Sequence, residues 1–262
     1  MPPQILERAA ELLAPAQSIL FITGAGISAD SGLPTYRGVG GLYDADDTEE
    51  GLPIEVCLSG EMFRARPEVT WRYIRQIEQR CRGAQPNVAH QLIATLERRL
   101  ERVVVLTQNV DGLHAAAGSD KLIAIHGDTQ QLRCTACSWR ERVTDYAALD
   151  PVLPRCPDCA AVIRPDVILF GEMLPTDAVD MLYRELDLGF DAVVSIGTSA
   201  VFPYISGPVH QARQARRPTI EINPGDTEIS PLVDLHLRLG ASAAMTGIYA
   251  ALERRWATLP PC

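Results

Sequence analysis

Three features are missing from this chain of 262 residues, and each absence excludes a class of protein. No apolar run approaches the roughly 20 residues that span a bilayer, so the sequence predicts no membrane partner. The segment 1–4 lacks the basic stretch, followed by an apolar one, that is typical of a signal peptide. Basic residues are outnumbered by acidic ones, and the net charge is −9. Nucleic-acid binding needs Lys and Arg to neutralise phosphates, so this charge argues against it. We therefore expect a soluble, cytoplasmic protein that binds no nucleic acid.

Acidic residues cluster in the segment 44–50, whose sequence is Asp-Ala-Asp-Asp-Thr-Glu-Glu. Such a run of charge is typical of a solvated loop. The alternative is a position near a substrate entrance, where the negative charge would favour basic peptides.

A glycine turn directly after an apolar run is the most informative pattern in the chain. The run Ile-Leu-Phe-Ile-Thr has the character of a buried strand, and Gly24 and Gly26 follow it at once. Such a turn brings backbone N–H groups close to a pyrophosphate. The next glycine is Gly32, so the G-x-G-x-x-G of ordinary dehydrogenases is absent, whereas Tyr36 and Arg37 add a ring and a guanidinium. The pattern predicts a dinucleotide site whose chemistry takes place on the dinucleotide itself.

Four of the seven cysteines form two Cys-x-x-Cys pairs separated by 18 residues. The four are Cys134, Cys137, Cys156 and Cys159. Each pair presents two thiolates from one tight turn, and two such turns complete a tetrahedron around zinc. Because protein fills all four positions, the metal would stabilise a module and take no part in catalysis. The alternative interpretation is two disulfides or a redox pair.

Apolar segments that end in small polar clusters recur along the chain. Strands are expected at 19–23, 103–106, 122–125, 167–170, 192–196 and 218–222. Helical patterns are found at 6–13, 64–82 and 90–100. This order predicts an α/β fold with an open parallel sheet, in which ligands gather at the carboxyl ends of the strands. We therefore expect the segments 24–37, 107–111, 126–127 and 197–199 to converge.

Six motifs and the cysteine pairs occur in the order found in sirtuins. The motifs are Gly-Ala-Gly-Ile-Ser with Pro-Thr-Tyr-Arg in 24–37, Thr-Gln-Asn-Val-Asp-Gly-Leu-His at 107–114, His-Gly at 126–127, Phe-Gly-Glu at 170–172, Gly-Thr-Ser at 197–199 and Glu-Ile-Asn at 221–223. Over about residues 15–250 the chain resembles this family of NAD-dependent protein lysine deacylases, in its bacterial form. The resemblance implies a Rossmann-type NAD-binding domain formed by 1–37, 91–127 and 164–262. It also implies a small domain made of a helical module, 38–90, and a zinc-binding module, 128–163.

The resemblance also implies roles for individual residues. Asn109 and Asp111 would hold the carboxamide of nicotinamide, and Gln108 would approach the adjoining ribose. The residues implied to bind NAD are Gly24, Ala25, Gly26, Ser28, Thr35, Tyr36, Arg37, Gln108, Asn109, Asp111, Gly197, Thr198, Ser199, Asn223 and Ser242. Phe170, Gly171 and Glu172 would pair by their backbone with an acyl-lysine protein or peptide.

His126 is the residue that we expect to act in catalysis, together with Asn109 and Asp111. An imidazole with an ordinary pKa near 6.5 accepts a proton at neutral pH. In the reaction that the resemblance implies, the acyl oxygen attacks the ribose carbon that carries nicotinamide. His126 then draws a proton from a ribose hydroxyl, and lysine and O-acyl-ADP-ribose result.

The identity of the acyl group depends on two positions in the segment 64–82. Sirtuins that remove succinyl or malonyl groups carry Tyr-x-x-Arg there, and the matching residues are Ile74 and Ile77. An apolar pair cannot neutralise a buried carboxylate, so we expect acetyl or another neutral acyl group to be preferred. Thr35 and Tyr36 point the other way, since threonine with an aromatic residue also occurs in desuccinylase-like members. The other interpretation of Ile74 and Ile77 is that they pack in a helix core.

Two other functions compete with deacylation. Mono-ADP-ribosyl transfer would use the same NAD site, with a protein side chain attacking the ribose carbon. A non-catalytic module that binds NAD or acyl-lysine would not need His126, Asn109 and Asp111 together.

Overall fold

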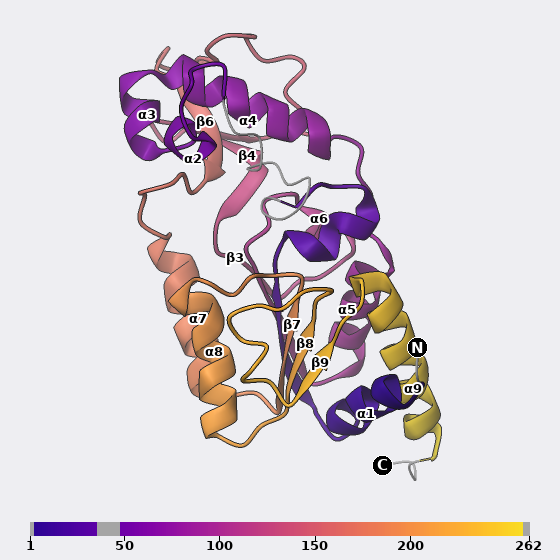
Figure 1. The fold of residues 1–262 in the computed structure, drawn as a ribbon. Coiled ribbons are helices and arrows are strands. Elements are labelled where there is room, and N and C mark those ends of the chain that lie inside the picture. The colour runs from indigo at the N-terminus through magenta and orange to yellow at the C-terminus, as the bar shows by residue number, and fades with distance from the viewer. Residues whose placement is uncertain (1–2, 36–47, 259–262) are drawn as a thin grey trace.

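The computed structural model describes residues 3–35 and 48–258 and has two lobes of unequal size (Figure 1). The large lobe contains a parallel sheet between two layers of helices, and the small lobe contains short helices on a small antiparallel sheet. Tyr36, Arg37 and the acidic residues Asp44, Asp46 and Asp47 lie outside the described residues. No helix in the described part of the chain is both long and apolar enough to cross a bilayer.

The sheet of the large lobe has six parallel strands in the order β3-β2-β1-β7-β8-β9. Its strands are β1 (Ser18–Thr23), β2 (Arg102–Thr107), β3 (Leu122–Ala124), β7 (Ala192–Ile196), β8 (Thr219–Ile222) and β9 (Leu235–Leu237). Central strands are buried along nearly their whole length because helices cover both faces. The predicted α/β class and parallel Rossmann-type sheet are confirmed.

Alternate residues of β1 serve the two helical layers. Ile19 and Phe21 pack toward α1 (Pro3–Leu13), α5 (Val88–Arg99) and α9 (Ala241–Thr258). Leu20 and Ile22 pack toward α7 (Thr176–Leu188) and α8 (Pro203–Gln214) on the other face. Because side chains alternate along a strand, one apolar run supplies both halves of the core. Burying each such side chain stabilises the fold by about 1.5–3 kcal/mol.

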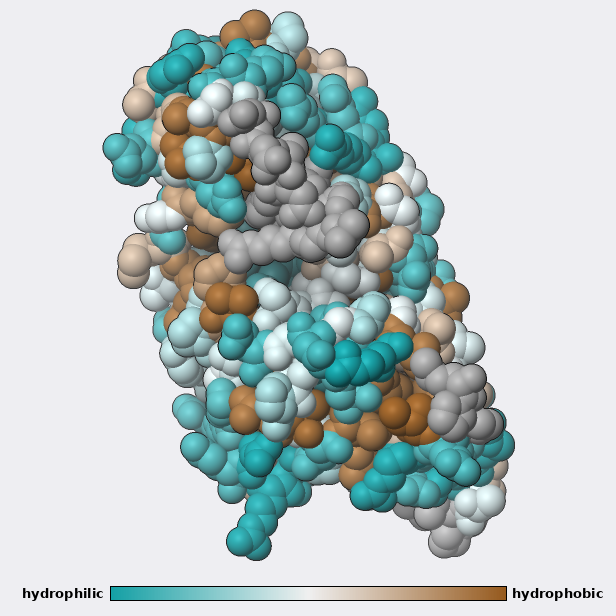
Figure 2. Space-filling view, viewed as in Figure 1, coloured by the Kyte–Doolittle hydropathy of each residue, from teal (hydrophilic) through white to brown (hydrophobic). Residues whose placement is uncertain are grey.

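The small lobe combines segments that are far apart in the sequence. Its elements are α2 (Ile54–Cys57), α3 (Gly60–Ala65), α4 (Pro67–Cys81), β4 (Gly127–Cys134), β5 (Arg140–Arg142) and β6 (Ile163–Val167). The strands form an antiparallel sheet in the order β5-β4-β6. Trp71 of α4 is fully buried, and its Nε1 donates to the carbonyl oxygen of Ile163 over 2.8 Å. In the view of Figure 2, hydrophilic side chains form much of the rim of this lobe.

Two predicted elements differ from the structure. The run 167–170 is not a strand of the main sheet, because β6 ends at Val167 and pairs with β4 in the small lobe. The single helix expected at 64–82 is divided into α3 and α4 at Arg66, since a residue before proline avoids the helical conformation. Strand β9 is three residues long and had not been predicted.

Candidate active site

Loops that follow several strands meet at the carboxyl edge of the main sheet. Gln108, directly after β2, donates from Nε2 to Oγ1 of Thr198, after β7, over 2.6 Å. Asn109 donates from Nδ2 to the carbonyl oxygen of Gly24, after β1, over 3.1 Å. His126, after β3, has Nδ1 3.1 Å from the carbonyl oxygen of Gln108. The segments expected at one edge of the sheet are therefore joined by direct hydrogen bonds.

Three glycines allow two of these loops to cross at backbone contact. A Cβ atom on Gly26 would lie 2.6 Å from Cα of Gly197, and one on Gly24 would lie 2.8 Å from the Gly197 carbonyl oxygen. The N–H of Gly24 donates to the carbonyl oxygen of Ile196, and the N–H of Gly26 donates to that of Gly197. Both N–H groups are thus engaged within the fold. The glycines of the first motif serve first to let the loop after β1 pack on the loop after β7.

Asn109 and Asp111 meet Ser28 at the centre of the cluster. Ser28 belongs to the 3-10 helix η1 (Ala25–Ser31), and its hydroxyl donates to Oδ2 of Asp111 over 2.7 Å. Asn109 Nδ2 lies 3.3 Å from the same hydroxyl oxygen. Burial raises the pKa of Asp111, against the opposing effect of hydrogen bonds from the Leu113 N–H and Ser28. A carboxamide and a carboxyl group held side by side offer both donors and acceptors to a bound amide.

His126 carries a neutral imidazole at neutral pH. Burial lowers its pKa below 6.5, although the hydrogen bond to the Gln108 carbonyl raises it. Its Nδ1 faces the Gln108 carbonyl oxygen, and its Nε2 lies 2.8 Å from the hydroxyl of Tyr204. A neutral imidazole beside loop backbone and amide groups is suited to accept a proton.

The residues expected near adenosine follow neighbouring strands of the main sheet. Nδ2 of Asn223, after β8, donates to the carbonyl oxygen of Thr198 over 3.2 Å, and the carbonyl of Ser199 accepts from the N–H of Glu228. Ser242 lies at the start of α9, where its N–H donates to Asp30 of η1 over 2.9 Å. The hydroxyl oxygen of Ser242 is buried and has no hydrogen-bond partner among the described residues.

Phe170 and Gly171 lie in a turn between the two lobes. The N–H of Phe170 donates to the carbonyl oxygen of Leu58, and its own carbonyl accepts from the N–H of Gly60. Gly171 has a φ of 79°, in the left-handed region that a side chain disfavours. The N–H of Glu172 closes the turn on the carbonyl of Leu169.

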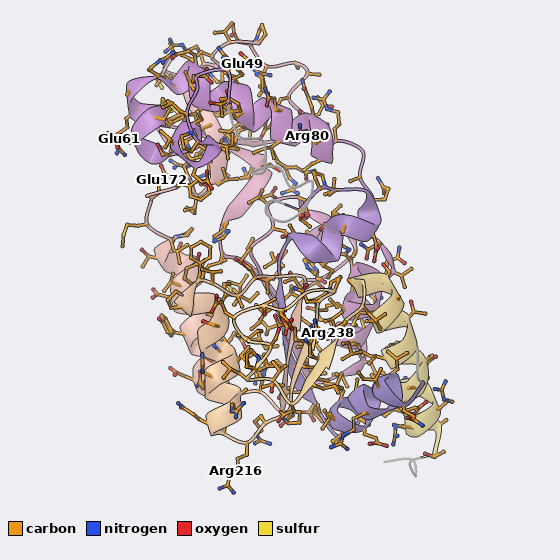
Figure 3. All side chains as sticks on the ribbon, viewed as in Figure 1. Glu49, Glu61, Arg80, Glu172, Arg216 and Arg238 are labelled. Atoms are coloured by element: carbon orange, nitrogen blue, oxygen red, sulfur yellow. The ribbon has the colours of Figure 1, made fainter. Side chains whose placement is uncertain are left out.

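The carboxylate of Glu172 is bound within the small lobe. It accepts hydrogen bonds from Nη1 and Nη2 of Arg164 at 2.7 and 2.9 Å, and from the N–H of Leu169 at 2.9 Å. Figure 3 places Glu172 at the lower edge of this lobe. The Arg164 side chain is 4% exposed and that of Glu172 is 21% exposed, so the guanidinium is buried and the carboxylate partly buried.

Ile74 and Ile77 occupy different depths of the small lobe. Ile74 is 4% exposed and belongs to the same core as Trp71. Ile77 is only partly buried and packs against that core from its edge. Ile77 is therefore the more exposed member of the pair.

The four predicted metal ligands come together at the end of the small sheet. The sulfur atoms of Cys134, Cys137, Cys156 and Cys159 all lie within 4.8 Å of one another. The Cys134–Cys159 and Cys137–Cys156 sulfur separations are 3.4 and 3.6 Å. Tetrahedral zinc with sulfur at about 2.3 Å requires separations of about 3.8 Å, whereas a disulfide requires about 2 Å. The set fits a structural zinc ion and excludes the disulfide interpretation.

Two residues of the site had not been predicted. Tyr204 contacts His126, and no pattern in the sequence distinguishes it. Asn87 donates from Nδ2 to the carbonyl of Ile27 over 2.7 Å and to the hydroxyl of Ser31 over 3.0 Å, so it anchors η1. Asn87 is also the N-cap of α5, and an asparagine directly before a helical pattern is a recognisable signal.

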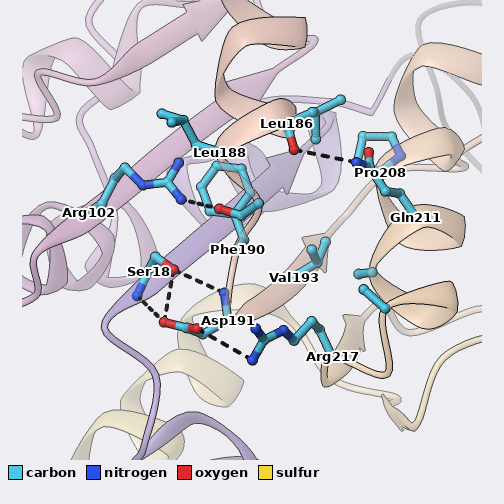
Figure 4. Close-up of a pocket in the computed structure, with 13 residues that line it drawn as sticks. Ser18, Arg102, Leu186, Leu188, Phe190, Asp191, Val193, Pro208, Gln211 and Arg217 are labelled. Carbon is cyan, nitrogen blue, oxygen red and sulfur yellow. Dashed lines mark hydrogen bonds and ion pairs between the residues drawn. The ribbon is translucent and has the colours of Figure 1, made fainter.

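A pocket of about 240 Å³ lies at the opposite, amino end of the strands (Figure 4). Ser18, Arg102 and Asp191 line it at the starts of β1, β2 and β7, and Phe190 forms its apolar wall. The pocket contains none of the predicted site residues. Asp191 binds Ser18, and Arg102 binds Glu185, so its charged groups have partners within the fold.

Comparison with known proteins identifies the family. Residues 24–203 match the model of the Sir2 family. The chain belongs to the Sir2 family. It is 50% identical over 247 residues to NAD-dependent protein deacylase 2 of Pseudomonas aeruginosa. The aligned residues cover 94% of this chain and 96% of that protein.

Two solved structures of Sir2 homologues have the same fold. One, in complex with NAD, superposes with a TM-score of 0.82 at 36% identity and covers 97% of this chain and 95% of that one. Another, in complex with 2'-O-acetyl ADP-ribose, has a TM-score of 0.83 at 35% identity, with 100% of both chains covered. The resemblance to sirtuins that was drawn from the motifs is confirmed.

Proposed function

We propose that this chain removes acyl groups from protein lysines in an NAD-dependent reaction that yields nicotinamide and O-acyl-ADP-ribose. The observation that carries the proposal is the neutral imidazole of His126, bonded through Gln108 to the loop after β7. Membership of the Sir2 family supports the same reaction, because a relative sharing half of its residues is named an NAD-dependent protein deacylase.

NAD binds along the carboxyl edge of the main sheet. Asn109 and Asp111, beside Ser28, bind the carboxamide of nicotinamide, and Gln108 contacts the adjoining ribose. Further NAD contacts are assigned to Gly24, Ala25, Gly26, Thr35, Tyr36 and Arg37 at the pyrophosphate, and to Gly197, Thr198, Ser199, Asn223 and Ser242 toward the adenosine. The crossing of the loops after β1 and β7 supports this assignment, since it brings Gly24 and Gly26 against Gly197.

The reaction consists of two steps on the ribose. The acyl oxygen of the substrate lysine bonds to the ribose carbon, and the bond to nicotinamide breaks; the pyridinium charge makes nicotinamide a good leaving group. His126 then takes the proton of a ribose hydroxyl at Nε2, and that oxygen attacks the acyl carbon. The bond from the acyl carbon to the lysine nitrogen breaks, and the amine leaves with a proton. A water molecule then adds to the acyl carbon, and breaking one of its bonds to the ribose oxygens leaves O-acyl-ADP-ribose. A base of this kind contributes about 10²–10⁴ to the rate.

The acyl-lysine peptide binds at the turn formed by Phe170, Gly171 and Glu172. Backbone pairing there accepts many sequences. The Glu172 side chain is held by Arg164, so its contribution to the peptide comes from the backbone. Ile77, partly exposed at the edge of the small-lobe core, gives the acyl group an apolar surface, and Ile74 supports it from within that core.

The two lobes are assigned as domains. The sequence predicted an NAD-binding domain at 1–37, 91–127 and 164–262 and a small domain at 38–90 with 128–163, and we extend the small domain to Val167 because β6 pairs with β4. A shared core of α4 and the strand β4 supports treating the last two segments as one unit.

The proposal is tested by nicotinamide release from NAD in the presence of an acetyl-lysine peptide, for the wild type and His126→Ala. We expect the variant to lose at least about a hundredfold in rate. His210→Ala is the matched control, since His210 is exposed on α8. Full turnover by His126→Ala would contradict the proposal. Mass spectrometry identifies the product: ADP-ribosylated protein without O-acetyl-ADP-ribose would establish ADP-ribosyl transfer instead.

The preference for a neutral acyl group is tested with acetyl and succinyl peptides of one sequence. We expect faster nicotinamide release with the acetyl peptide, because the apolar side chains of Ile74 and Ile77 cannot neutralise the distal carboxylate of a succinyl group. Faster removal of succinyl by the wild type would reject this preference but not deacylation itself.

A further inference from the structure

The hydroxyl of Tyr204 is hydrogen-bonded to Nε2 of His126, the ring nitrogen that takes a proton in the proposed reaction. Nδ1 of His126 lies 3.1 Å from the Gln108 carbonyl oxygen, which only accepts hydrogen bonds, so Nδ1 carries the ring proton. The ring is neutral because burial lowers its pKa, and Nε2 therefore presents a lone pair. The Tyr204 hydroxyl, 2.8 Å from Nε2, must be the donor in this bond.

Aromatic packing holds Tyr204 in this position. Its ring stacks on that of Phe202, with centroids 5.4 Å apart and an interplanar angle of 13°. The His126 ring stands edge-on to both, at 6.0 Å from Tyr204 and 6.2 Å from Phe202. Tyr204 follows Pro203, whose fixed φ begins α8. Burial also raises the pKa of Tyr204, so its hydroxyl remains a donor at neutral pH.

The lone pair on Nε2 cannot accept two hydrogen bonds at once. In the structure it accepts from Tyr204. To take the proton of a ribose hydroxyl, it must accept a hydrogen bond from that hydroxyl instead. The two hydroxyl groups therefore compete for the same atom.

We propose that Tyr204 is a positioning residue that caps His126 in the ligand-free protein and is displaced by the ribose hydroxyl of NAD. While the cap is in place, both ring nitrogens are satisfied, and the imidazole is held in the Nδ1–H tautomer that the reaction requires. The displacement costs one hydrogen bond, which weakens NAD binding without affecting the bound complex. This inference rests on the proposed function of His126.

The first test is made without turnover, on the ligand-free full chain labelled with ¹⁵N-histidine. Two-bond ¹H–¹⁵N correlation spectra report which ring nitrogen carries the proton. We expect wild-type His126 in the Nδ1–H form, with an Nε2 signal that moves when ADP-ribose is added. In Tyr204→Phe, which keeps the stacked ring, that signal should be shifted before any ligand is present. Tyr249→Phe removes a hydroxyl from α9 and should leave the His126 signals unchanged.

The second test is kinetic. Tyr204→Phe removes the competing hydroxyl. Its KM for NAD should be lower than that of the wild type by roughly two- to tenfold, and its kcat should stay within about twofold of the wild-type value. An unchanged KM, or His126 signals identical to those of the wild type, would overturn the cap. A large fall in kcat would also overturn it, because the hydroxyl would then be needed in the chemical step. Absence of turnover by the wild type would reject the proposed function, whereas the spectra would still report on the cap.

Discussion

His90 and His114 lie edge to face beneath the candidate site, with 4.8 Å between their ring centroids. His90 Nδ1 accepts from the N–H of Asn87, so its Nε2 carries the proton. The Thr23 hydroxyl donates its proton to the Thr107 hydroxyl, so it can only accept a hydrogen bond from Nε2 of His114. His114 therefore carries its ring proton on Nε2 and a lone pair on Nδ1. Nε2 of His90 and Nδ1 of His114 have no hydrogen-bond partner within residues 3–35 and 48–258, and they are thus one donor and one acceptor. Both rings are neutral parts of the core.

This pair makes the fold sensitive to mild acid. Burial lowers the pKa of His90 to about 4 and that of His114 to about 3. Below pH 6.5 the unfolded chain therefore binds protons that the folded chain does not, and stability falls as the pH decreases from 6.5 toward 4. Each ring contributes up to about 1.4 kcal/mol per pH unit. The melting temperature of the wild type should fall between pH 7 and pH 5. The fall should be less steep for His114→Gln, and it should equal that of the wild type for the control His210→Gln. A slope in His114→Gln equal to that of the wild type would show that His114 is not buried as a neutral ring.

Gly26→Ala should prevent the two site loops from crossing. The new Cβ would lie 2.6 Å from Cα of Gly197, and neither backbone can yield without breaking its hydrogen bonds. We expect a loss of at least about 1–3 kcal/mol in the free energy of unfolding, and weaker NAD binding. Gly207→Ala in α8 is the control, because no atom lies within 4 Å of the added Cβ. That variant should be neutral or more stable by about 0.5–1 kcal/mol. Urea denaturation measures both, and a Gly26→Ala protein as stable as the wild type would disprove the backbone contact.

Removal of one thiol of the cysteine cluster should release the metal. The purified protein should contain one zinc per chain, and Cys137→Ser should contain none and have a lower melting temperature, because metal binding contributes to folding. Cys81→Ser is the matched control, since Cys81 lies at the end of α4 and not in the cluster. Metal analysis by mass spectrometry decides the question. Retention of stoichiometric zinc by Cys137→Ser would mean that this thiol is not a ligand.

Glu172→Ala should destabilise the small lobe by leaving Arg164 buried without its partner. Breaking such a pair typically costs about 3–5 kcal/mol. Glu61→Ala, at an exposed position of α3, should cost less than about 0.5 kcal/mol. Burial by itself would raise the pKa of Glu172. The hydrogen bonds from Arg164 and from the Leu169 N–H lower the pKa by more than burial raises it, so the net shift is downward. The stability that the pair contributes is therefore fully present above pH 4.5 and is lost as the pH falls below it. Equal unfolding free energies for Glu172→Ala and Glu61→Ala would contradict this role.

The sequence predicted the elements whose burial leaves a direct pattern. Strands β1, β2 and β7 are continuous apolar runs because helices cover both faces, and the spacing of the four cysteines reflects the tetrahedron that they form. The run 167–170 shows the limit of such patterns. An apolar tetrapeptide has the same composition whether it joins a sheet or crosses between lobes, and only its partners Leu58 and His126 distinguish the two.

The details of the site depend on contacts that no local pattern contains. The pairing of Gly26 with Gly197 joins residues that are far apart in the chain, so the sequence indicated a turn but not the loop against which it packs. Tyr204 lies at an ordinary helix start, and its effect on His126 arises only from the approach of α8 to the end of β3. Both relationships are set by the tertiary fold.

One strand connects the two kinds of chemistry in this molecule. Strand β4 begins at Gly127, next to His126, and ends at Cys134, the first thiol of the metal cluster. Strand β6 returns antiparallel to it, and the N–H of Ile168 then bonds the carbonyl oxygen of His126 over 2.9 Å. A metal bound by the cysteines thus lies at one end of the β4–β6 pair. The other end of the pair carries the imidazole of His126 and the turn at Phe170. Zinc at the cysteine cluster would in this way keep His126 and the turn at Phe170 at a constant spacing, although it lies at the other end of the strand.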